Sequence, residues 1–234
     1  MVVRARRARM NPSIDEGLVV NHPFSEGVGS TIFDRSPYGV KGSLYNTAWQ
    51  DTVYGMGLKF DGENGTYVEC NKATEIGSDA TTDPFSFICT FKFDGLTNGT
   101  NKVFQVLANR INGHGSRGFL YYHETNGSVI FQGQDDISNP KTHQLSGTNV
   151  LNGLKHSVVY TFDGSEMKGY WDGVYINSTT WIGGVYRGIS FLRFGCGATT
   201  GHFVFNGVLY EFRVYDRCLS PQEVRVLHDM RRRV

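Results

Sequence analysis

The 234-residue sequence lacks any apolar run that approaches the ~18 residues needed for a membrane-spanning helix. Its opening, MVVRARRARMNPSIDEG, also lacks the apolar stretch of ~7 residues or more that a secretory signal carries. We therefore expect no membrane insertion. We also expect either that a signal is not part of this sequence or that the protein works where it is made.

Cysteine is scarce and forms no metal-binding motif. Cys70, Cys89, Cys196 and Cys218 form neither a CxxC motif nor a His/Cys pattern at zinc-ligand spacing. Cys89 lies in FSFICTFKF, where it shares one strand face with four phenylalanines, as a small core residue does. We predict free thiols. Two disulfides in an oxidising compartment are the alternative, and the sequence does not choose among the three pairings.

Motifs for nucleophilic catalysis and phosphate binding are also missing. There is no G-x-S-x-G sequence, and no Gly-rich loop precedes a helix. His114 and His202 stand in glycine-containing segments without partners at zinc-ligand spacing. His156 stands beside Ser157, but we predict that it is a structural histidine whose hydrogen bonds are satisfied.

The net charge of +1 conceals an uneven distribution. Seven arginines lie at the two ends with no acid among them: Arg4, Arg6, Arg7, Arg9, Arg231, Arg232 and Arg233. Without them, 16 basic residues face 22 acidic ones, a formal charge of −6. Basic ends on an acidic body favour docking onto an acidic surface, and solubilising tails are the alternative. We do not expect the acidic part of the chain between the two basic ends to bind nucleic acid.

The sequence is rich in glycine, with 29 residues, and in aromatics, at 13%. Short alternating segments separated by turn dipeptides such as Asp163-Gly164 and Asp172-Gly173 indicate many antiparallel strands. The clearest unit is 155–177, which reads as a three-stranded meander. These features predict one all-β domain, either a sandwich or a barrel of antiparallel strands.

The C-terminal segment 205–227, FNGVLYEFRVYDRCLSPQEVRVL, reads as a strand followed by a helix. Val208, Tyr210, Phe212 and Val214 alternate with Leu209, Glu211, Arg213 and Tyr215, which predicts two unlike faces. Ser220, Pro221 and Glu223 then occupy the positions of a capping box. One short helix from Pro221 to about Met230 follows.

Four segments resemble the concanavalin A-like lectin/glucanase superfamily, in particular its laminin-G-like (LamG) domains. They are GLVVNHPFSEGVGSTIFDRSPYGVKGSL, GLKFDGENGTYVEC, LKHSVVYTFDGSEMKGYWDGVYIN and FNGVLYEFRVYDRCLSPQEV. The resemblance implies an all-β fold, an antiparallel two-sheet β-sandwich of the jelly-roll type with one short C-terminal helix. We divide the chain into a basic N-terminal arm at 1–16, a LamG-like sandwich at 17–230 and a basic tail at 231–234.

Compared with these relatives, the sequence lacks the residues expected for glycoside hydrolysis and for calcium binding. Laminarinase-type relatives carry E-x-D-x-x-E on one strand, and this sequence has no such triplet. The stretch GCGATTGH at 195–202, which matches the calcium-binding run of pentraxin-type relatives, has no carboxylate. We expect no catalytic residues and no cofactor. A single structural Ca²⁺ near Asp94, Asp135 or Asp136 is the alternative to ordinary turn aspartates.

Carbohydrate binding suits the fold, because sugars present C–H faces to exposed rings and hydroxyls to polar neighbours. The candidate glycan-binding residues are Trp49, Arg117, Tyr121, Tyr122, His123, Asn126, Trp181 and Tyr186. The competing interpretation is that most of these rings belong to the core or to a sheet face.

Three functions remain open. The first is a non-catalytic structural or recognition component of a larger particle, such as a virion surface, capsid decoration or fibre. In this case Arg4, Arg6, Arg7 and Arg9 anchor the arm to other chains of the assembly, and glycans are a further ligand. The second is a secreted or cell-surface carbohydrate-binding or adhesion module, which would be extracellular. The third is a glycoside hydrolase.

Overall fold

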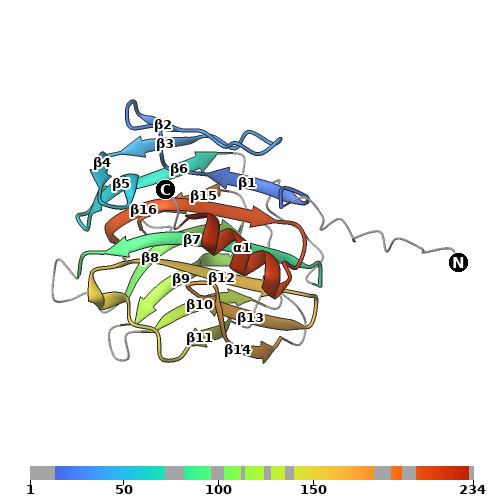
Figure 1. Cartoon of the computed structure of the whole chain (residues 1–234). Coiled ribbons are helices and arrows are strands. Elements are labelled where there is room, and N and C mark those ends of the chain that lie inside the picture. The colour runs from blue at the N-terminus through green and yellow to red at the C-terminus, as the bar shows by residue number, and fades with distance from the viewer. Residues whose placement is uncertain are drawn as a thin grey trace, which may run out of the picture.

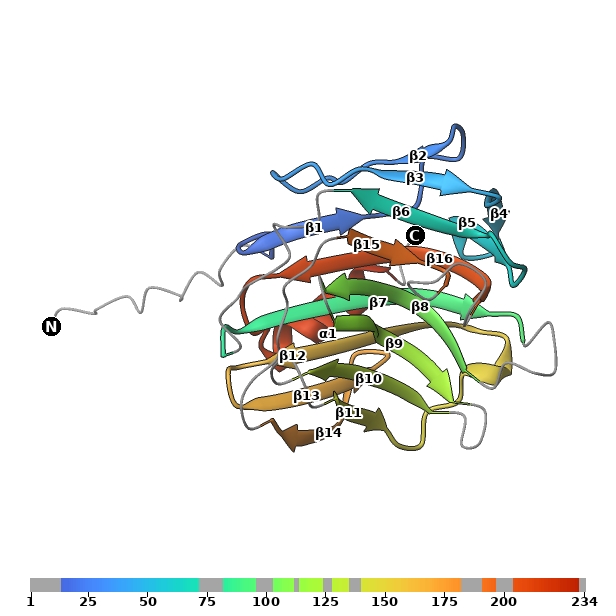
Figure 2. The ribbon, with the colours of Figure 1, turned by 180° about the vertical axis from the view of Figure 1, so that it is seen from behind.

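The chain forms two antiparallel β-sheets that pack face to face, with one helix on the outside (Figures 1 and 2). The computed structural model describes residues 14–71, 82–95, 103–111, 114–123, 128–134, 140–181, 191–196 and 204–231. The predicted all-β sandwich with a short C-terminal helix is confirmed. Among the described residues, no helix has the length and apolarity needed to cross a membrane.

Eight strands form the first sheet, sheet A. Their order is β14 (Val174–Thr180), β13 (Glu166–Trp171), β12 (Lys155–Phe162), β7 (Phe85–Phe93), β16 (Asn206–Tyr215), β5 (Gly55–Asp61) and β4 (Ala48–Thr52). The eighth strand, β1 (Leu18–His22), also pairs with β16. β5 pairs with residues 206–209 of β16, and β1 pairs with residues 212–215. The two neighbours of β16 therefore meet near Tyr210 and Glu211.

Eight further strands form sheet B. Their order is β11 (Pro140–Leu145), β10 (Val129–Gln134), β9 (His114–His123), β8 (Val103–Ile111), β15 (Phe191–Phe194), β6 (Tyr67–Asn71), β3 (Gly42–Tyr45) and β2 (Thr31–Ile32). A short 3₁₀ helix, η2 (Val150–Asn152), precedes β12. The short strands β2, β3, β4 and β11 were not predicted, because their sequences show weak hydrophobic alternation.

The core lies between the two sheets and is rich in phenylalanine. The Phe212 ring of sheet A lies 5.1 Å from that of Phe194 in sheet B, and Phe87 lies 5.5 Å from Phe131. Each buried ring of this kind contributes about 1.5–3 kcal/mol. The predicted inward face of β7 is confirmed, since Phe85, Phe87, Cys89, Phe91 and Phe93 all belong to this core. All four cysteines are free thiols, as predicted.

The helix α1 (Pro221–Arg231) covers part of the outer face of sheet A, away from sheet B (Figures 1 and 2). Its predicted capping box is confirmed. The Ser220 amide donates to Glu223 Oε2 at 2.8 Å, and the Glu223 amide donates to Ser220 Oγ at 3.3 Å. Val224 and Leu227 bury their side chains against a second apolar cluster, which includes Ile88, Val159 and Tyr215. This contact fixes α1 on the sheet.

A β-bulge interrupts β16 and corrects the predicted alternation. Leu209, Phe212 and Val214 belong to the core, so the inward residues are not spaced regularly by two. The register with β7 shifts between Leu209 and Glu211, which is the mark of an extra residue in the strand. Opposite the bulge, a Cβ on Gly57 would lie 2.5 Å from Val208 Cγ1 and 2.9 Å from the Leu209 carbonyl oxygen. The absence of a side chain at Gly57 therefore lets β5 approach the bulged strand.

The predicted meander is also confirmed. β12, β13 and β14 pair in sequence as antiparallel neighbours. Asp172 and Gly173, with φ angles of 50° and 78°, make the second turn, as a tight hairpin with two left-handed central residues requires.

Candidate functional site

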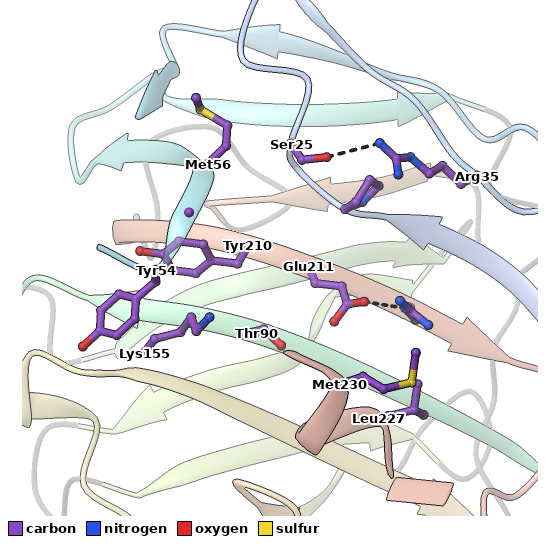
Figure 3. A pocket seen from close by; sticks show the side chains of 13 residues that line it. Ser25, Arg35, Tyr54, Met56, Thr90, Lys155, Tyr210, Glu211, Leu227 and Met230 are labelled. Carbon is purple, nitrogen blue, oxygen red and sulfur yellow. Dashed lines mark hydrogen bonds and ion pairs between the residues drawn. The ribbon is translucent and has the colours of Figure 1, made fainter. Parts of the chain in front are cut away.

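A pocket of about 390 Å³ opens on the outer face of sheet A beside α1 (Figure 3). We call it the outer pocket. Segments far apart in the sequence build it: the loops after β1 and β2, the β4–β5 hairpin, three central strands and α1. Its lining residues are Pro23, Ser25, Arg35, Tyr54, Gly55, Met56, Thr90, Lys155, Tyr210, Glu211, Arg213, Leu227 and Met230.

Two tyrosines and a lysine form one side of the outer pocket. The rings of Tyr54 and Tyr210 meet edge to face, 6.2 Å apart. Lys155 Nζ lies 5.3 Å from the Tyr54 ring centre and 5.4 Å from that of Tyr210, within cation–π range of both. The Tyr210 hydroxyl shares a 3.1 Å hydrogen bond with Thr52 Oγ1. Burial raises the pKa of Tyr210, so its hydroxyl stays protonated at neutral pH.

Glu211 and Arg213 form an ion pair in the outer pocket. Glu211 Oε1 lies 2.5 Å from Arg213 Nε. The bulge at Tyr210 places Glu211 on the same outer face as Tyr210 and Arg213, so three residues of one short stretch line the pocket. Burial alone would lower the pKa of Arg213, but the neighbouring Glu211 carboxylate raises it, and the guanidinium stays charged.

Thr90 lies on β7 between Lys155 and Glu211 (Figure 3). In the strand register it stands opposite Ser157 on one side and Glu211 on the other. The residue is 2% exposed, and its Oγ1 has no hydrogen-bond partner among the described residues. A buried hydroxyl without a partner is costly, so Thr90 is an unsatisfied polar position within the sheet beneath the outer pocket.

The lining of the outer pocket has more cationic than acidic side chains. Three lining residues are cationic (Arg35, Lys155 and Arg213), and one is acidic (Glu211). Arg35 is exposed and donates from its guanidinium to Ser25 Oγ at 3.3 Å. Lys155 stands directly opposite Lys92 on β7.

Asp94, a predicted calcium ligand, lies next to this region and is engaged by lysines. Its carboxylate pairs with Lys92 and with Lys59, whose Nζ is 2.7 Å away. Burial alone would raise the pKa of Asp94, but the hydrogen bonds from the two lysines lower it. Within the described part of the chain, no group of three His, Cys, Asp or Glu side chains could hold a metal ion. Asp135 and Asp136 lie outside the described residues.

The sequence-based glycan residues are not brought together at the outer pocket. Trp49 lies on β4, where it packs partly against the core and donates from Nε1 to the Gly29 carbonyl at 3.0 Å. Arg117, Tyr121, Tyr122 and His123 lie on β9 in the other sheet. There, Tyr121 stands opposite Ile130 and Tyr122 opposite Val129. Asn126 and Tyr186 lie outside the described residues, as do Arg4, Arg6, Arg7 and Arg9 of the arm.

Trp181 requires a correction, because the structure buries it. The side chain is 1% exposed and packs edge to face on Phe131 in the core, 5.4 Å between ring centres. It therefore cannot offer a ring face to a sugar. The indole follows β14 directly and belongs to the core between the two sheets.

His156 is a structural histidine, as predicted. Its ring nitrogens lie 2.8 Å from Asp172 Oδ2 and 2.9 Å from Asn152 Oδ1, and its ring stacks on Trp171 at 4.3 Å. Next to it, Ser157 Oγ lies 3.1 Å from His228 Nδ1 of α1. Ser157 is buried, so this contact holds the helix on the sheet.

Sequence reasoning missed the residues that line the outer pocket. Tyr54 and Arg35 belong to loops and hairpins whose position depends on distant pairing. Tyr210, Glu211 and Arg213 were noted only as members of a regular strand. The sequence carried one signal: Lys155 alternates with the buried residues of the meander, which indicates an outward-facing side chain. This alternation does not distinguish a lysine that binds a ligand from one that only contacts water.

The chain shows clear similarity to known folds and families. A family model described as the concanavalin A-like lectin/glucanases superfamily matches residues 61–225. No curated protein sequence matches. Among solved structures, the binding domain of Paraclostridial Mosquitocidal Protein 1 superposes with a TM-score of 0.75 and 14% identity, over 93% of this chain and 53% of that one.

Two structures of the botulinum neurotoxin DC binding domain are also similar. One is in complex with rat synaptotagmin II, with a TM-score of 0.73. The other is in complex with SialylT, with a TM-score of 0.72. Each is 12% identical and is matched over 94% of this chain and 52% of its own length.

These similarities differ in what they establish. The chain spans about half the length of each of these binding domains, and at such low identity the structures establish the fold alone. The family model, in contrast, covers more than half of the chain, including the meander and the strand that leads to α1. The chain belongs to the concanavalin A-like lectin/glucanases superfamily.

Proposed function

We propose that the chain is a non-catalytic recognition module that binds carbohydrate in the outer pocket. The observation that carries the proposal is the pairing of the Tyr54 and Tyr210 rings with Lys155, Thr90 and Arg213 in one pocket. Rings offer a surface for sugar C–H groups, and the polar side chains offer donors for sugar oxygens. Leu227 and Met230 of α1 add an apolar wall.

The acidic residues of the outer pocket support binding without cleavage. Glycoside hydrolysis needs two carboxyl groups on opposite sides of the scissile bond. Glu211 is the single acid among the lining residues, and its carboxylate is paired with Arg213. The second carboxyl group that either hydrolytic mechanism requires is therefore missing from the lining of the outer pocket.

The structural neighbours are in keeping with this proposal. The botulinum neurotoxin DC binding domain has been solved in complex with SialylT and in complex with rat synaptotagmin II. Because this chain matches about half of those domains, their ligands serve only as a guide to the class of ligand.

A glycan array tests this function. The chain as given should bind a subset of glycans, and Tyr54→Ala should weaken that binding about tenfold or more by removing one ring. Tyr175→Ala is the matched control, since Tyr175 is a half-exposed tyrosine on β14 that does not line the pocket. An array on which no glycan binds, or on which both variants behave alike, contradicts the proposal.

We further propose that the module works within a larger particle, such as a virion surface, with the basic N-terminal arm as its anchor. The support is the run of four arginines, Arg4, Arg6, Arg7 and Arg9, next to a body of negative formal charge. A secreted or cell-surface adhesion module is the alternative context.

Deleting the arm tests the particle context. Ile14 packs against the apolar cluster under α1, and Arg217 Nε donates to the Glu16 carbonyl oxygen at 2.7 Å. The deletion should therefore stop at residue 13. The truncated protein should fold normally and fail to enter its assembly, whereas incorporation at the full-length level would argue against an anchoring arm.

A further inference from the structure

We infer that the segment 22–25, which follows β1, is an acid-sensitive latch on the outer pocket. While the His22 ring is neutral, it stays in the core and holds Pro23 and Ser25 in the pocket wall. Protonation of the ring drives it out of the core, and this wall of the pocket opens. The opening itself needs no ligand, whereas its effect on binding rests on the proposed function.

The segment turns its side chains alternately toward the core and toward the outer pocket. His22 and Phe24 are both 0% exposed. Pro23 and Ser25 line the outer pocket, and the Ser25 hydroxyl accepts the hydrogen bond from Arg35 (Figure 3). The position of the pocket wall therefore depends on the two inward side chains.

The His22 ring lies against aromatic side chains and a thiol. It packs edge to face on Phe194 of β15, 5.9 Å between ring centres, and lies 6.1 Å from the Phe24 ring. In the strand register, Phe212 of β16 stands opposite it. The Cys70 sulfur of β6 lies 3.8 Å from its Nε2. Burial raises the pKa of the Cys70 thiol, so this group supplies no negative charge for an imidazolium.

One carboxylate, that of Asp34, acts on His22 from the loop after β2. Its charge favours the protonated ring, as does the Phe33 backbone. The carboxylate already accepts hydrogen bonds from the Ser36 hydroxyl and from the backbone amides of Asn21, Ser36 and Val40. Burial of the ring outweighs both contributions and lowers the pKa of His22 to about 4.

Other charged side chains on the strands around His22 face away from it. Glu69 and Arg193 precede the core residues Cys70 and Phe194 directly, so they lie on the opposite face of sheet B, where they pair with each other. Arg213 of β16 lines the outer pocket. An imidazolium at His22 would therefore be poorly compensated in the core.

The backbone of Phe24 makes the segment easier to open. Its φ angle is 46°, a conformation that is sparsely populated for a bulky residue. The Phe24 ring packs edge to face on Phe194, 5.3 Å between ring centres, and this packing holds the strained backbone in place. The strain is released when the ring leaves the core, so opening costs less than it would for an unstrained segment.

The direction of the pH effect follows from the two pKa values of His22. In the open segment the ring is in water, and its pKa returns to about 6.5. Above that pH the ring is neutral in both forms, and the closed segment has its full stability. As the pH falls from about 6.5 to about 4, protonation favours the open form. The ratio of open to closed segment should rise about twentyfold between pH 7 and pH 5.

Thiol labelling tests the opening directly. Cys70 is buried next to His22, and Cys89, a buried core residue on β7, is the internal reference. The protein is treated with dithiodipyridine, and the labelled peptides are quantified by mass spectrometry. Both thiols experience the same pH, so their ratio reports the local opening. The ratio of Cys70 to Cys89 labelling should rise about tenfold or more from pH 7 to pH 5.

Variants assign the response to His22. His22→Leu and His22→Gln remove the titrating ring, and in whichever variant folds the labelling ratio should stay the same at pH 7 and pH 5. His143→Gln is the matched control. His143 is also buried, but it lies on β11, contacts Asn177 at 2.8 Å and does not line the outer pocket. This variant should keep the full response of Cys70.

Glycan binding links the opening to the outer pocket. A glycan that the array identifies should bind several-fold more weakly to the chain as given at pH 5 than at pH 7. The folded His22 variant should show a smaller difference between the two pH values.

The outcomes separate this inference from the proposed function. A labelling ratio that does not rise at pH 5, or that rises equally in the folded His22 variant, overturns the latch. A ratio that rises while glycan binding stays the same at both pH values overturns its control of the pocket. Absence of glycan binding at either pH contradicts the proposed function, and the labelling then decides on the latch without a ligand.

Discussion

The outer face of sheet A has two halves that are built from the same three strands and differ in character. Under α1, the strands present Ile88, Val159 and Tyr215, all buried in one apolar cluster. A few residues away on the same strands, the sheet presents Thr90, Lys155 and Glu211 to a pocket. Strand pairing is continuous across both halves, so the difference lies in the side chains and in what covers them.

The covered half contributes stability, and the open half carries the groups that we propose bind carbohydrate. α1 buries apolar side chains and fixes its own position, which also gives the open half one rigid wall. In the open half, a bulge on β16 gathers Tyr210, Glu211 and Arg213 at the point where β5 ends its pairing and β1 begins. Bulges commonly re-aim side chains next to sites, and this one does so at the cost of regular alternation.

The largest expected difference between the halves is in stability. Leu219→Ala, in the covered half, removes a side chain that is 1% exposed in the cluster under α1. Its free energy of unfolding should fall by about 3 kcal/mol, as cavity-forming substitutions of this kind do. Val226→Ala, at an exposed position of α1, should change it by less than about 0.5 kcal/mol.

Urea-induced unfolding measures both variants, and glycan binding by the folded protein should be retained in each. Equal stability of Leu219→Ala and the unaltered chain would show that α1 does not stabilise this half.

The second expected effect is the pH dependence of the helix cap. Burial alone would raise the pKa of Glu223, but hydrogen bonds from Arg217 and Ser220 lower it. The unfolded chain takes up a proton near pH ~4.3, so the ionised carboxylate stabilises the fold fully above that pH. This contribution is lost as the pH falls through the lower folded-state pKa. Glu223→Gln should therefore cost about 1 kcal/mol at pH 7 and much less near pH 3.

The measurement is urea unfolding of both proteins at several pH values. Asp229→Asn, which removes a different carboxylate from α1, serves as the control. A cost of Glu223→Gln that does not change with pH would contradict the role of the ionised cap.

The smallest expected effect on stability lies in the open half. Thr90→Val replaces the buried hydroxyl by a methyl group of similar size, and this hydroxyl has no partner among the described residues. Stability should be unchanged within about 0.5 kcal/mol or rise slightly, since no hydrogen bond is lost. A large loss of stability would place Thr90 with the structural residues instead.

The sequence predicted the elements that local patterns determine. Strict alternation in 155–162 and the capping box at Ser220 are set within a few residues, and both are present as predicted. The bulge at Tyr210 was not predictable, because no glycine or proline marks it and β16 continues on both sides. Its cause lies in the neighbouring strands, where Gly57 of β5 permits the close approach.

The candidate site was less predictable than the fold. Residue type alone does not distinguish an exposed aromatic side chain from a core one. Trp181 and Tyr54 illustrate the difference. Trp181 packs on Phe131 in the core, whereas Tyr54 stands on the β4–β5 hairpin next to Tyr210 of a strand far along the chain. Only long-range pairing brings these residues to their places.

The most direct measurement of the central claim is NMR chemical-shift mapping with a glycan that the array identifies. If the outer pocket is the binding site, the largest shifts fall on residues 210–213 of β16, on Lys155 and on Leu227 and Met230 of α1. If the shifts instead concentrate on β9, at Arg117 and 121–123, the ligand binds sheet B and this assignment of the site is wrong.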